Sequence, residues 1–581
     1  MTHSLSHLSP SNRRLLEERW RAIDLAKLEP SILWRRCTIR LLIVTDRLSF
    51  SPTDDFGLGT FVKVLLDTPL WGRVRISLAN IGPFNAFHAD PSLASEARIA
   101  ARTDNFRFDN ASHFDPAQFD AVFLFGISAV YTGGARTGAT LDDSEIAVLN
   151  AFQNGGGGLF ATGDHGKLGF ALCSKVARAR DMRYWDSSPP TADPRDPNDQ
   201  VSMQGERRND TNVFNAGSNV FDDQSDDVPQ AITPRFYSRT TGIFRYRYPH
   251  PLLCGPNGAI RVMPDHPHEG QCKTPASLDE TVSVSGPDTP EYPAATAGGP
   301  RPTPEVISWN SVAAGRVSGN KEPTLSQSFA GIAAYDGHRA GVGRVVTDAT
   351  WHHFVNVNLV GIDGVELPNP FATGFLASAA GQAAFEEIKV YFRNLMKWLS
   401  RPATISCLRS SILVSLVLKD RVLEAVLTAQ GIGLDRLSPK VLSIIGAHAR
   451  DVLGRYAGQC QSREIIIDLI AVEWHRFVDP WIPIDPDPPG PDPFRDDFDA
   501  LPLVDFGPML DAALGGALVA ISNEFLDEDP KRLAKIESDR VFEVARKGAS
   551  IAVDKSREAL ERALTEARSV ALSGRADRTA S

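Results

Sequence analysis

The chain has 581 residues, of which 42% are hydrophobic and 23% are charged, a balance that excludes a mostly disordered or collagen-like chain. Its 61 Lys and Arg against 71 Asp and Glu give a formal net charge of −10. Without a basic block, such a chain is not expected to bind nucleic acid.

The sequence shows no export or membrane signal. The first twenty residues are polar and lack the apolar core of a signal peptide. The longest apolar runs, Ser411–Leu418 and Leu510–Ile521, fall short of the ~20 residues that cross a bilayer. We therefore expect a cytoplasmic protein without a membrane partner, in which Leu510–Ile521 is a buried core helix or a partner-facing helix.

The cysteines are far apart and form no CxxC pair. They are Cys37, Cys173, Cys254, Cys272, Cys407 and Cys460. This spacing predicts neither a disulfide framework nor a Cys-rich zinc module, and it favours a reducing compartment.

Apolar strand patterns alternate with helix patterns over the first 400 residues. After an amphipathic helix over Ser11–Glu29, strands are expected at Arg40–Asp46, Val74–Ile81, Phe119–Gly126, Leu159–Thr162, Ile260–Met263, Phe329–Tyr335 and Arg344–Thr347. Helices are expected at Thr60–Leu66, Leu141–Phe152, Leu168–Ala179 and Ser378–Leu399. The pattern predicts an α/β fold with a parallel sheet covered by helices on both faces.

Only helix patterns remain after residue 400. They cover Ser410–Leu427, Pro439–Leu453, Arg463–Val478 and a long stretch from Pro530 to about Leu572. The dense prolines of 481–494 predict an extended linker. The long helix is polar with a thin apolar stripe, so we expect it to dock on the body or on a second copy of the chain, the alternative being a solvated helix.

The expected organisation follows from these changes of pattern. Residues 1–38 hold an N-terminal helix, and 39–400 form the α/β domain with insertions at about 186–234 and 274–304. Residues 401–480 form a helical region, 481–494 the Pro-rich linker, and 495–581 a helical tail.

Titratable side chains follow several predicted strands directly, where open parallel sheets bind ligands. Asp46 follows the first strand, Asp164 and His165 follow GGLFATG, and Asp348, His352 and His353 follow GRVVT. The motif PDHPHEG after another strand contains Asp265, His266, His268 and Glu269.

Histidine and carboxylate side chains are typical ligands of zinc and related ions. His266 and His268 would point the same way in an extended chain. We therefore predict that His165, His266, His268, Glu269 and His353 bind a divalent metal ion such as zinc. Asp164, His165, Asp348, His352 and His353 are the predicted catalytic residues. The alternative is that these histidines cap loops and bond to the backbone. Arg178, Arg180 and Arg183, after the DHG motif, are expected on a solvated face.

The motifs GGGGLFATGDHG and GRVVTDATWHH resemble the class I glutamine amidotransferase-like superfamily over about residues 39–400, most closely its ThuA-like (trehalose utilisation) branch. The resemblance implies a flavodoxin-like, doubly wound sheet. The nucleophilic Cys of amidotransferases is missing, since the turn reads Thr162-Gly163-Asp164-His165. Cys173 lies in a predicted helix and should be buried, so we do not expect a glutaminase.

The expected function is that of a metal-assisted hydrolase or lyase acting on a small polar substrate, which the resemblance suggests is sugar-like. The alternative is a ligand-sensing or scaffold protein without enzymatic activity. Such a protein would use a degenerate amidotransferase-like domain, with the C-terminal helices binding a protein partner or a second copy.

Overall fold

A computed structural model describes residues 37–68, 73–82, 96–128, 141–164, 167–185, 207–208, 227–241, 244–255, 258–265, 268–282, 288–312, 326–361, 373–417, 422, 425–426, 429, 431–457, 507–525 and 536–579. The predicted helices Ser11–Glu29 and Arg463–Val478 and the predicted linker 481–494 lie outside the described residues.

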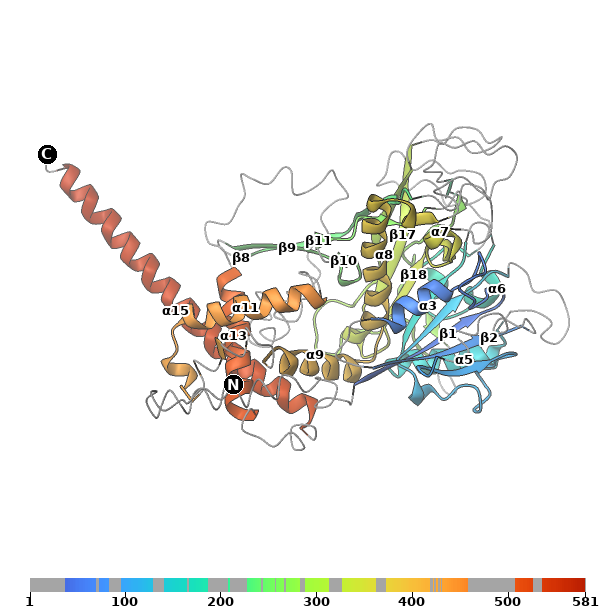
Figure 1. The fold of residues 1–581 in the computed structure, drawn as a ribbon, viewed down its shortest axis with the longest axis horizontal. Coiled ribbons are helices and arrows are strands. Elements are labelled where there is room, and N and C mark those ends of the chain that lie inside the picture. Colours follow the sequence, from blue (N-terminus) through green and yellow to red (C-terminus); the bar gives the residue numbers. More distant parts are fainter. Residues whose placement is uncertain are drawn as a thin grey trace, which may run out of the picture.

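A ten-stranded mixed sheet has the strand order β12-β7-β16-β17-β18-β5-β4-β1-β2-β3. The sheet lies at the end of the molecule opposite the projecting end of α15 (Ser538–Thr579) (Figure 1). Its parallel part consists of β3 (Ile99–Thr103), β2 (Arg73–Asn80), β1 (Thr38–Thr45), β4 (Ala121–Phe125), β5 (Gly158–Thr162) and β18 (Val345–Asp348). This part confirms the α/β class, and β1, β2, β4, β5 and β18 confirm five of the predicted strands. The strand β3 was not predicted because most of its residues are exposed or half-buried.

The other part of the sheet is antiparallel, so the prediction of an entirely parallel sheet is wrong here. Beyond β18, the sheet continues with β17 (Gln327–Tyr335), β16 (Glu305–Val312), β7 (Gln230–Pro234) and β12 (Val262–Met263). A strand buried on both faces has the same continuous apolar pattern whichever way it runs, so the pattern could not reveal the direction. The strand β7 also lies inside a stretch predicted to be a surface insertion.

Four short strand pairings and a set of short helical turns also belong to the described residues. The strand pairs are β8 (Phe236–Thr241) with β9 (Phe244–Pro249), β10 (Cys254–Gly255) with β11 (Gly258–Ala259), β6 (Arg207–Arg208) with β13 (His268–Glu269), and β14 (Thr281–Val282) with β15 (Thr289–Pro290). The turns are η2 (Pro116–Gln118), η3 (Ala179–Asp181), η6 (Pro251–Leu253), η7 (Gly337–Ala340), η8 (Trp351–His353), α7 (Val357–Val360), η9 (Gly374–Ala377) and η10 (Leu434–Arg436).

Helices cover both faces of the sheet, as predicted. The core on one face includes side chains of α3 (Gly59–Leu66) and α8 (Ala379–Trp398), and the core on the other includes those of α5 (Asp143–Asn154) and α6 (Phe170–Cys173). On the first face Phe61 packs edge-on against Phe354 and Phe392, with ring centroids 5.2 and 5.1 Å apart. The predicted helix Leu168–Ala179 is much shorter, because turns and η3 follow α6.

The C-terminal region is helical wherever it is described. It contains α9 (Pro402–Val417), α11 (Pro439–Ala457), α13 (Gly507–Phe525) and α15 (Ser538–Thr579). The apolar helix α13 is buried along nearly its whole length, which confirms it as a core helix. Among the described helices, none combines the length and apolar character needed to cross a membrane.

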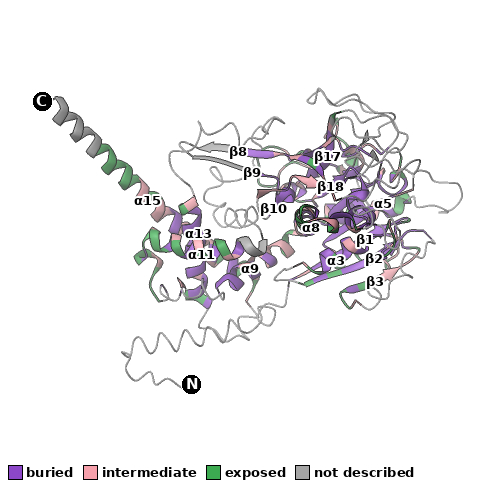
Figure 2. Ribbon diagram, turned by 45° about the horizontal axis from the view of Figure 1, so that its top comes forward, coloured by how far each residue is buried: buried purple, intermediate pink, exposed green. Residues whose placement is uncertain are grey.

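The long helix α15 divides into a packed half and a projecting half. Val541, Ala545, Ala549 and Val553 are buried against the rest of the bundle. Residues 561–569 are exposed, and this end of the helix extends away from the body (Figures 1 and 2).

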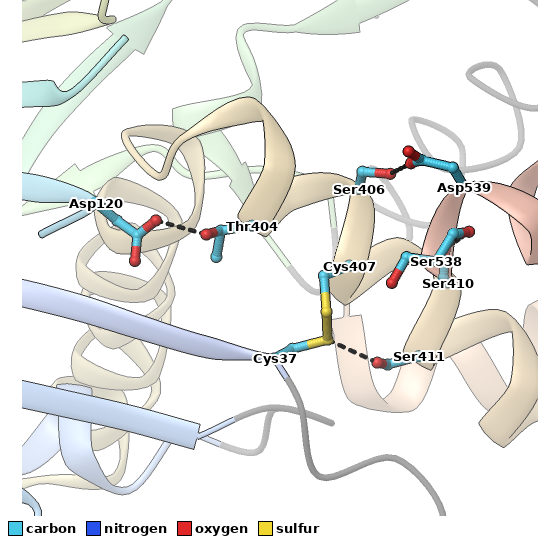
Figure 3. Close-up of a disulfide and its surroundings, with 9 residues drawn as sticks. All are labelled: Cys37, Asp120, Thr404, Ser406, Cys407, Ser410, Ser411, Ser538 and Asp539. Atoms are coloured by element: carbon cyan, nitrogen blue, oxygen red, sulfur yellow. Dashed lines mark hydrogen bonds between the residues drawn. A yellow bond between two sulfur atoms is a disulfide. The ribbon is translucent and has the colours of Figure 1, made fainter. Parts of the chain in front are cut away.

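A disulfide between Cys37 and Cys407 joins the residue before β1 to α9 (Figure 3). The sequence predicts no disulfide framework, and this single disulfide is a pair that it did not indicate. The two cysteines are 370 residues apart, so no local spacing signalled them. The Ser411 hydroxyl donates a hydrogen bond of 3.0 Å to Cys37 Sγ, and the Thr404 hydroxyl bonds Asp120 at 2.5 Å, so α9 is held to the sheet domain at several points.

Candidate functional site

The candidate site lies where β5 and β18 end side by side. The two strands are parallel neighbours, and Thr162 pairs with Asp348 at their carboxyl ends. Asp164 follows β5, Asp348 ends β18, and the turn η8 then carries His352 and His353. These four predicted residues are brought to one edge of the sheet, and all four are buried.

The turn η8 is positioned by side-chain caps. The Thr350 side chain accepts a hydrogen bond from the His352 N–H at 3.0 Å, which caps the turn. The Thr350 hydroxyl in turn donates to Asp164 Oδ1 at 2.8 Å. The backbone N–H of Trp351 bonds the Gly163 carbonyl at 2.7 Å. The segment that carries both histidines is therefore fixed to the end of β5.

His353 lies between two carboxylates in a fully buried cluster. Its Nδ1 is 2.6 Å from Asp348 Oδ1, and its Nε2 is 3.7 Å from Glu269 Oε1. All three side chains have a relative exposure of 0%. Burial acts to lower the pKa of His353, but the Asp348 and Glu269 carboxylates outweigh it and raise the pKa to about 10. Without a metal ion, His353 is therefore an imidazolium at neutral pH.

The remaining oxygens of both carboxylates also have partners. Tyr391 of α8 donates its hydroxyl to Asp348 Oδ2 at 2.8 Å. Asn310 of β16 donates to Glu269 Oε2 at 3.2 Å and to the Gln230 side chain of β7 at 2.7 Å. Burial raises the pKa of Glu269.

Glu269 reaches the site from a different part of the chain. It lies in β13, and the next residue, Gly270, donates its N–H to the Ala349 carbonyl at 3.2 Å. This bond places Glu269 beside the end of β18. The structure thus brings Glu269 of the PDHPHEG motif together with Asp348 and His353, as the sequence predicted.

A second histidine–carboxylate pair lies next to the first. His352 Nε2 is 3.7 Å from Asp164 Oδ2, and its Nδ1 is 2.7 Å from Asn358 Oδ1. Asn358 also donates to the Asp265 carbonyl at 2.8 Å. The His352 ring stacks on Trp351, with centroids 4.0 Å apart, and the exposed Phe56 packs against His352 in an edge-on arrangement.

Arg183 is a site residue that the sequence assigned to the wrong environment. Arg178 and Arg183 are fully buried, which corrects the expectation of a solvated face for these two. Arg183 donates to the backbone carbonyls of Asp348, Asp164 and Ala349 at 3.1, 2.6 and 2.7 Å. Its guanidinium therefore ties together the ends of β5 and β18, which no sequence motif indicated.

His165 and His266 lie outside the described residues, and the side chain of His268 does too. Within the described chain, the three-residue group with the spacing of a metal site is Asp181, Glu280 and Glu291, elsewhere in the fold. Arg180 already pairs with Glu280 and Glu291 at 2.7 and 2.5 Å, so a guanidinium occupies the place of a cation there.

The cysteines near the sheet are unsuited to nucleophilic chemistry. Cys173 and Cys272 are free and buried. Burial raises the pKa of Cys173 strongly and that of Cys272 to about 12, so neither forms a thiolate at neutral pH. The predicted burial of Cys173 is confirmed.

Comparison with known proteins gave no relatives: no family model, no curated protein and no solved structure matches this chain.

Proposed function

We propose that the chain is a metal-assisted hydrolase or lyase acting on a small polar substrate, with a divalent metal ion held by His353 and Glu269. One observation carries the proposal. His353 Nε2 and Glu269 Oε1 are fully buried, have no hydrogen-bond partner and face each other at 3.7 Å. Buried polar atoms nearly always have a partner, and 3.7 Å is too long for a hydrogen bond. An ion with bonds of about 2.0–2.2 Å to each atom fits a gap of this size.

The surroundings of His353 suit a metal ligand. Asp348 accepts a hydrogen bond from Nδ1, which leaves Nε2 as the atom available for an ion. A carboxylate behind a ligating histidine fixes its orientation and makes it a stronger ligand. Tyr391 donates a hydrogen bond to Asp348, which in turn orients His353, and Asn310 donates one to Glu269. Both proposed ligands, His353 and Glu269, are therefore held in position by neighbouring side chains. Further ligands would come from His165, His266 or His268.

The chemistry follows from the groups at the edge of the sheet. A bound metal ion would supply Lewis-acid activation of water or of a substrate oxygen. His352 and Asp164 form a separate pair that can hold or move a proton beside it. A sugar-like substrate is proposed from the resemblance to the ThuA-like branch alone.

The topology supports the proposed family resemblance. The complete parallel part has the order β3-β2-β1-β4-β5-β18, which is the order 3-2-1-4-5-6 of dinucleotide-binding doubly wound sheets, and it reverses between β1 and β4. Without the edge strand β3, the remaining five strands have the flavodoxin-like order 2-1-3-4-5. We propose that β2, β1, β4, β5 and β18 are the flavodoxin-like core and that β3 and the antiparallel strands are additions to it. The antiparallel addition has a role at the site, because Asn310 of β16, which also bonds Gln230 of β7, donates a hydrogen bond to Glu269.

A ligand-sensing protein without enzymatic activity is the second candidate. It is favoured by the complete burial of His353, Glu269 and Asp348. An imidazolium between two carboxylates is also a stable arrangement that needs no reaction to explain it.

Metal binding by the full-length chain separates these two functions. We expect about one equivalent of Zn²⁺ or Mn²⁺ by elemental analysis, and a rise in melting temperature when the ion is added to stripped protein. Glu269→Gln should weaken binding on the order of 10–100-fold. His448→Ala, an exposed histidine of α11, should not change binding and serves as the control. Absence of metal binding by the wild-type chain would contradict the metal-assisted enzyme and favour the ligand-sensing protein.

A further inference from the structure

A cavity of about 450 Å³ lies where the sheet domain meets the C-terminal helices, away from the Glu269–His353 pair. Its walls come from η7, from Arg344 just before β18, from α9, and from the start of α15. We propose that this cavity binds a small organic anion, a carboxylate or phosphate with an apolar portion. The proposal is independent of the proposed function.

Arginines outnumber carboxylates at the cavity by one. Arg344, Arg409 and Arg546 line it with two carboxylates, Asp539 and Glu543. Asp336 pairs with Arg344 and Arg540 pairs with Glu543, so four guanidinium groups stand against three carboxylates. Both carboxylates have donors already: Ser406 donates to Asp539 Oδ1 at 3.1 Å (Figure 3), and Arg540 donates to Glu543 Oε2 at 2.8 Å. The local charge therefore favours an anionic ligand.

Two of the guanidinium groups are held in place. Arg344 bonds Asp336 Oδ1 and the Trp398 carbonyl at 2.7 and 3.0 Å, and its guanidinium carbon lies 4.6 Å from the Trp398 ring centre. The guanidinium of Arg546 lies 4.6 Å from the ring centre of Phe542. Cations fixed by neighbouring rings and carboxylates lose less side-chain entropy when they bind a ligand.

His338 adds a polar group without a charge. Its Nε2 is buried and has no hydrogen-bond partner. Burial and the nearby Arg344 lower the pKa of His338 to about 3, so the ring is neutral at physiological pH. A neutral imidazole nitrogen can complete the hydrogen bonds of a bound anion.

The remaining wall is apolar and sets the kind of anion. Pro402 and Ile405 of α9 and Phe542 of α15 line this side of the cavity. Pockets for small organic ligands have volumes of about 300–1,000 Å³ and combine apolar walls with a few polar groups. A bare inorganic ion would leave the apolar wall uncovered, whereas an organic anion would cover it.

Four probes test the two parts of the cavity in the full-length chain by calorimetry. Phenyl phosphate and benzoate carry both an anionic head and a ring, inorganic phosphate carries the head alone, and benzyl alcohol carries the ring alone. We expect phenyl phosphate or benzoate to bind at least tenfold more tightly than the other two, and the better of the two identifies the head group. Binding should weaken as salt is added. If neither binds at about 10 mM, the proposal is wrong.

Matched variants locate the binding. Arg409→Gln should weaken binding by about tenfold because a charge-assisted hydrogen bond is lost, and Arg409→Lys should weaken it less. Arg562→Gln, on the exposed part of α15, should have no effect. Circular dichroism and the melting temperature without ligand check folding, and Ile405→Trp provides a second variant that fills the cavity without changing charge. Binding that is unchanged in both Arg409→Gln and Ile405→Trp would overturn the proposal.

Discussion

At the scale of single residues, Asp348 is the group that determines what His353 can do. Both of its oxygens are engaged, one by His353 and one by Tyr391, and the cluster is closed to solvent. An ion that binds His353 must replace its proton, and Asp348 stabilises both the protonated ring and a metal-bound ring. The same carboxylate therefore supports the site whether or not a metal ion is bound.

Asp348→Asn tests whether the charge of Asp348 supports metal binding by His353, as distinct from a contribution of the side chain to packing alone. The substitution keeps the size of the side chain and removes its charge, so zinc affinity should fall on the order of 10–100-fold. Tyr391→Phe removes only one hydrogen bond and should lower the free energy of unfolding by about 1 kcal/mol. Zinc titration and urea unfolding measure the two effects. Equal zinc affinity in Asp348→Asn and the wild type would contradict the role given to Asp348.

His250 provides a pH prediction that does not involve the site. It is buried against Trp398, with ring centroids 5.2 Å apart, and burial lowers its pKa from 6.5 to about 3. Between these values the unfolded chain binds a proton that the folded chain does not, so stability falls as the pH drops below 6.5. The slope from this residue is at most about 1.4 kcal/mol per pH unit.

Urea unfolding at pH 7.5, 6.5 and 5.5 tests this. His250→Asn keeps an acceptor for the Leu252 N–H, which His250 caps, but removes the titration. The variant should be less stable at pH 7.5 and should lose less stability on acidification. Parallel pH curves for the two proteins would show that His250 does not titrate in this way.

The residues that could be predicted at the site are those that directly follow strands. Asp164, Asp348 and His353 were found because buried parallel strands are recognisable and their carboxyl ends meet at one edge. Asn310, Gln230 and Tyr391 were missed for a physical reason. Two of them come from β16 and β7, strands that the sequence pattern did not predict, and the third projects from a covering helix, where a tyrosine is an ordinary core residue.

At the scale of elements, the helical bundle depends on close contact between α13 and α15. A Cβ atom on Gly516 would lie 2.4 Å from the Gly548 carbonyl oxygen and 2.6 Å from Ala552 Cβ. These helices can therefore approach this closely only without side chains at Gly516 and Gly548. The apolar sequence of α13 predicted a buried helix, but not which partner lies against each side.

Gly516→Ala tests the contact with a single methyl group. Alanine stabilises an isolated helix by about 1 kcal/mol over glycine, so a stability loss would show that crowding outweighs propensity. We expect a net loss of about 1–3 kcal/mol in thermal or urea unfolding. Ala563→Ser, at an exposed position of the projecting half of α15, is the control and should change stability little. A stabilised Gly516→Ala protein would mean that the helices are farther apart.

At the scale of the whole molecule, the sheet domain and the C-terminal helices form one structural unit. A single apolar core extends from the α3 and α8 face of the sheet into α9, α11, α13 and α15. Arg401 reinforces the junction by donating to the carbonyls of Phe119 and Pro116, both at 2.9 Å. The proposed anion cavity lies at this junction, so a ligand there would contact both parts of the molecule.

The Cys37–Cys407 disulfide is the covalent part of this junction, and its effect should be large. It closes a loop across 370 residues, and restricting so long a loop in the unfolded chain stabilises the fold by up to about 5 kcal/mol. The double variant Cys37→Ser, Cys407→Ser should therefore melt at a lower temperature. Dithiothreitol should lower the melting temperature of the wild type toward that of the variant and leave the variant unchanged.

Thiol counting provides the matching chemical measurement. Denatured wild-type protein should expose two more thiols after reduction than before, and the double variant should expose the same number in both conditions. Disulfides persist mainly in oxidising compartments and are rare where glutathione and thioredoxin keep thiols reduced. If protein isolated with its thiols blocked at lysis shows no such difference, the two cysteines are reduced in the cell. The hydrogen bonds and the shared apolar core then hold α9 to the sheet without a covalent bond.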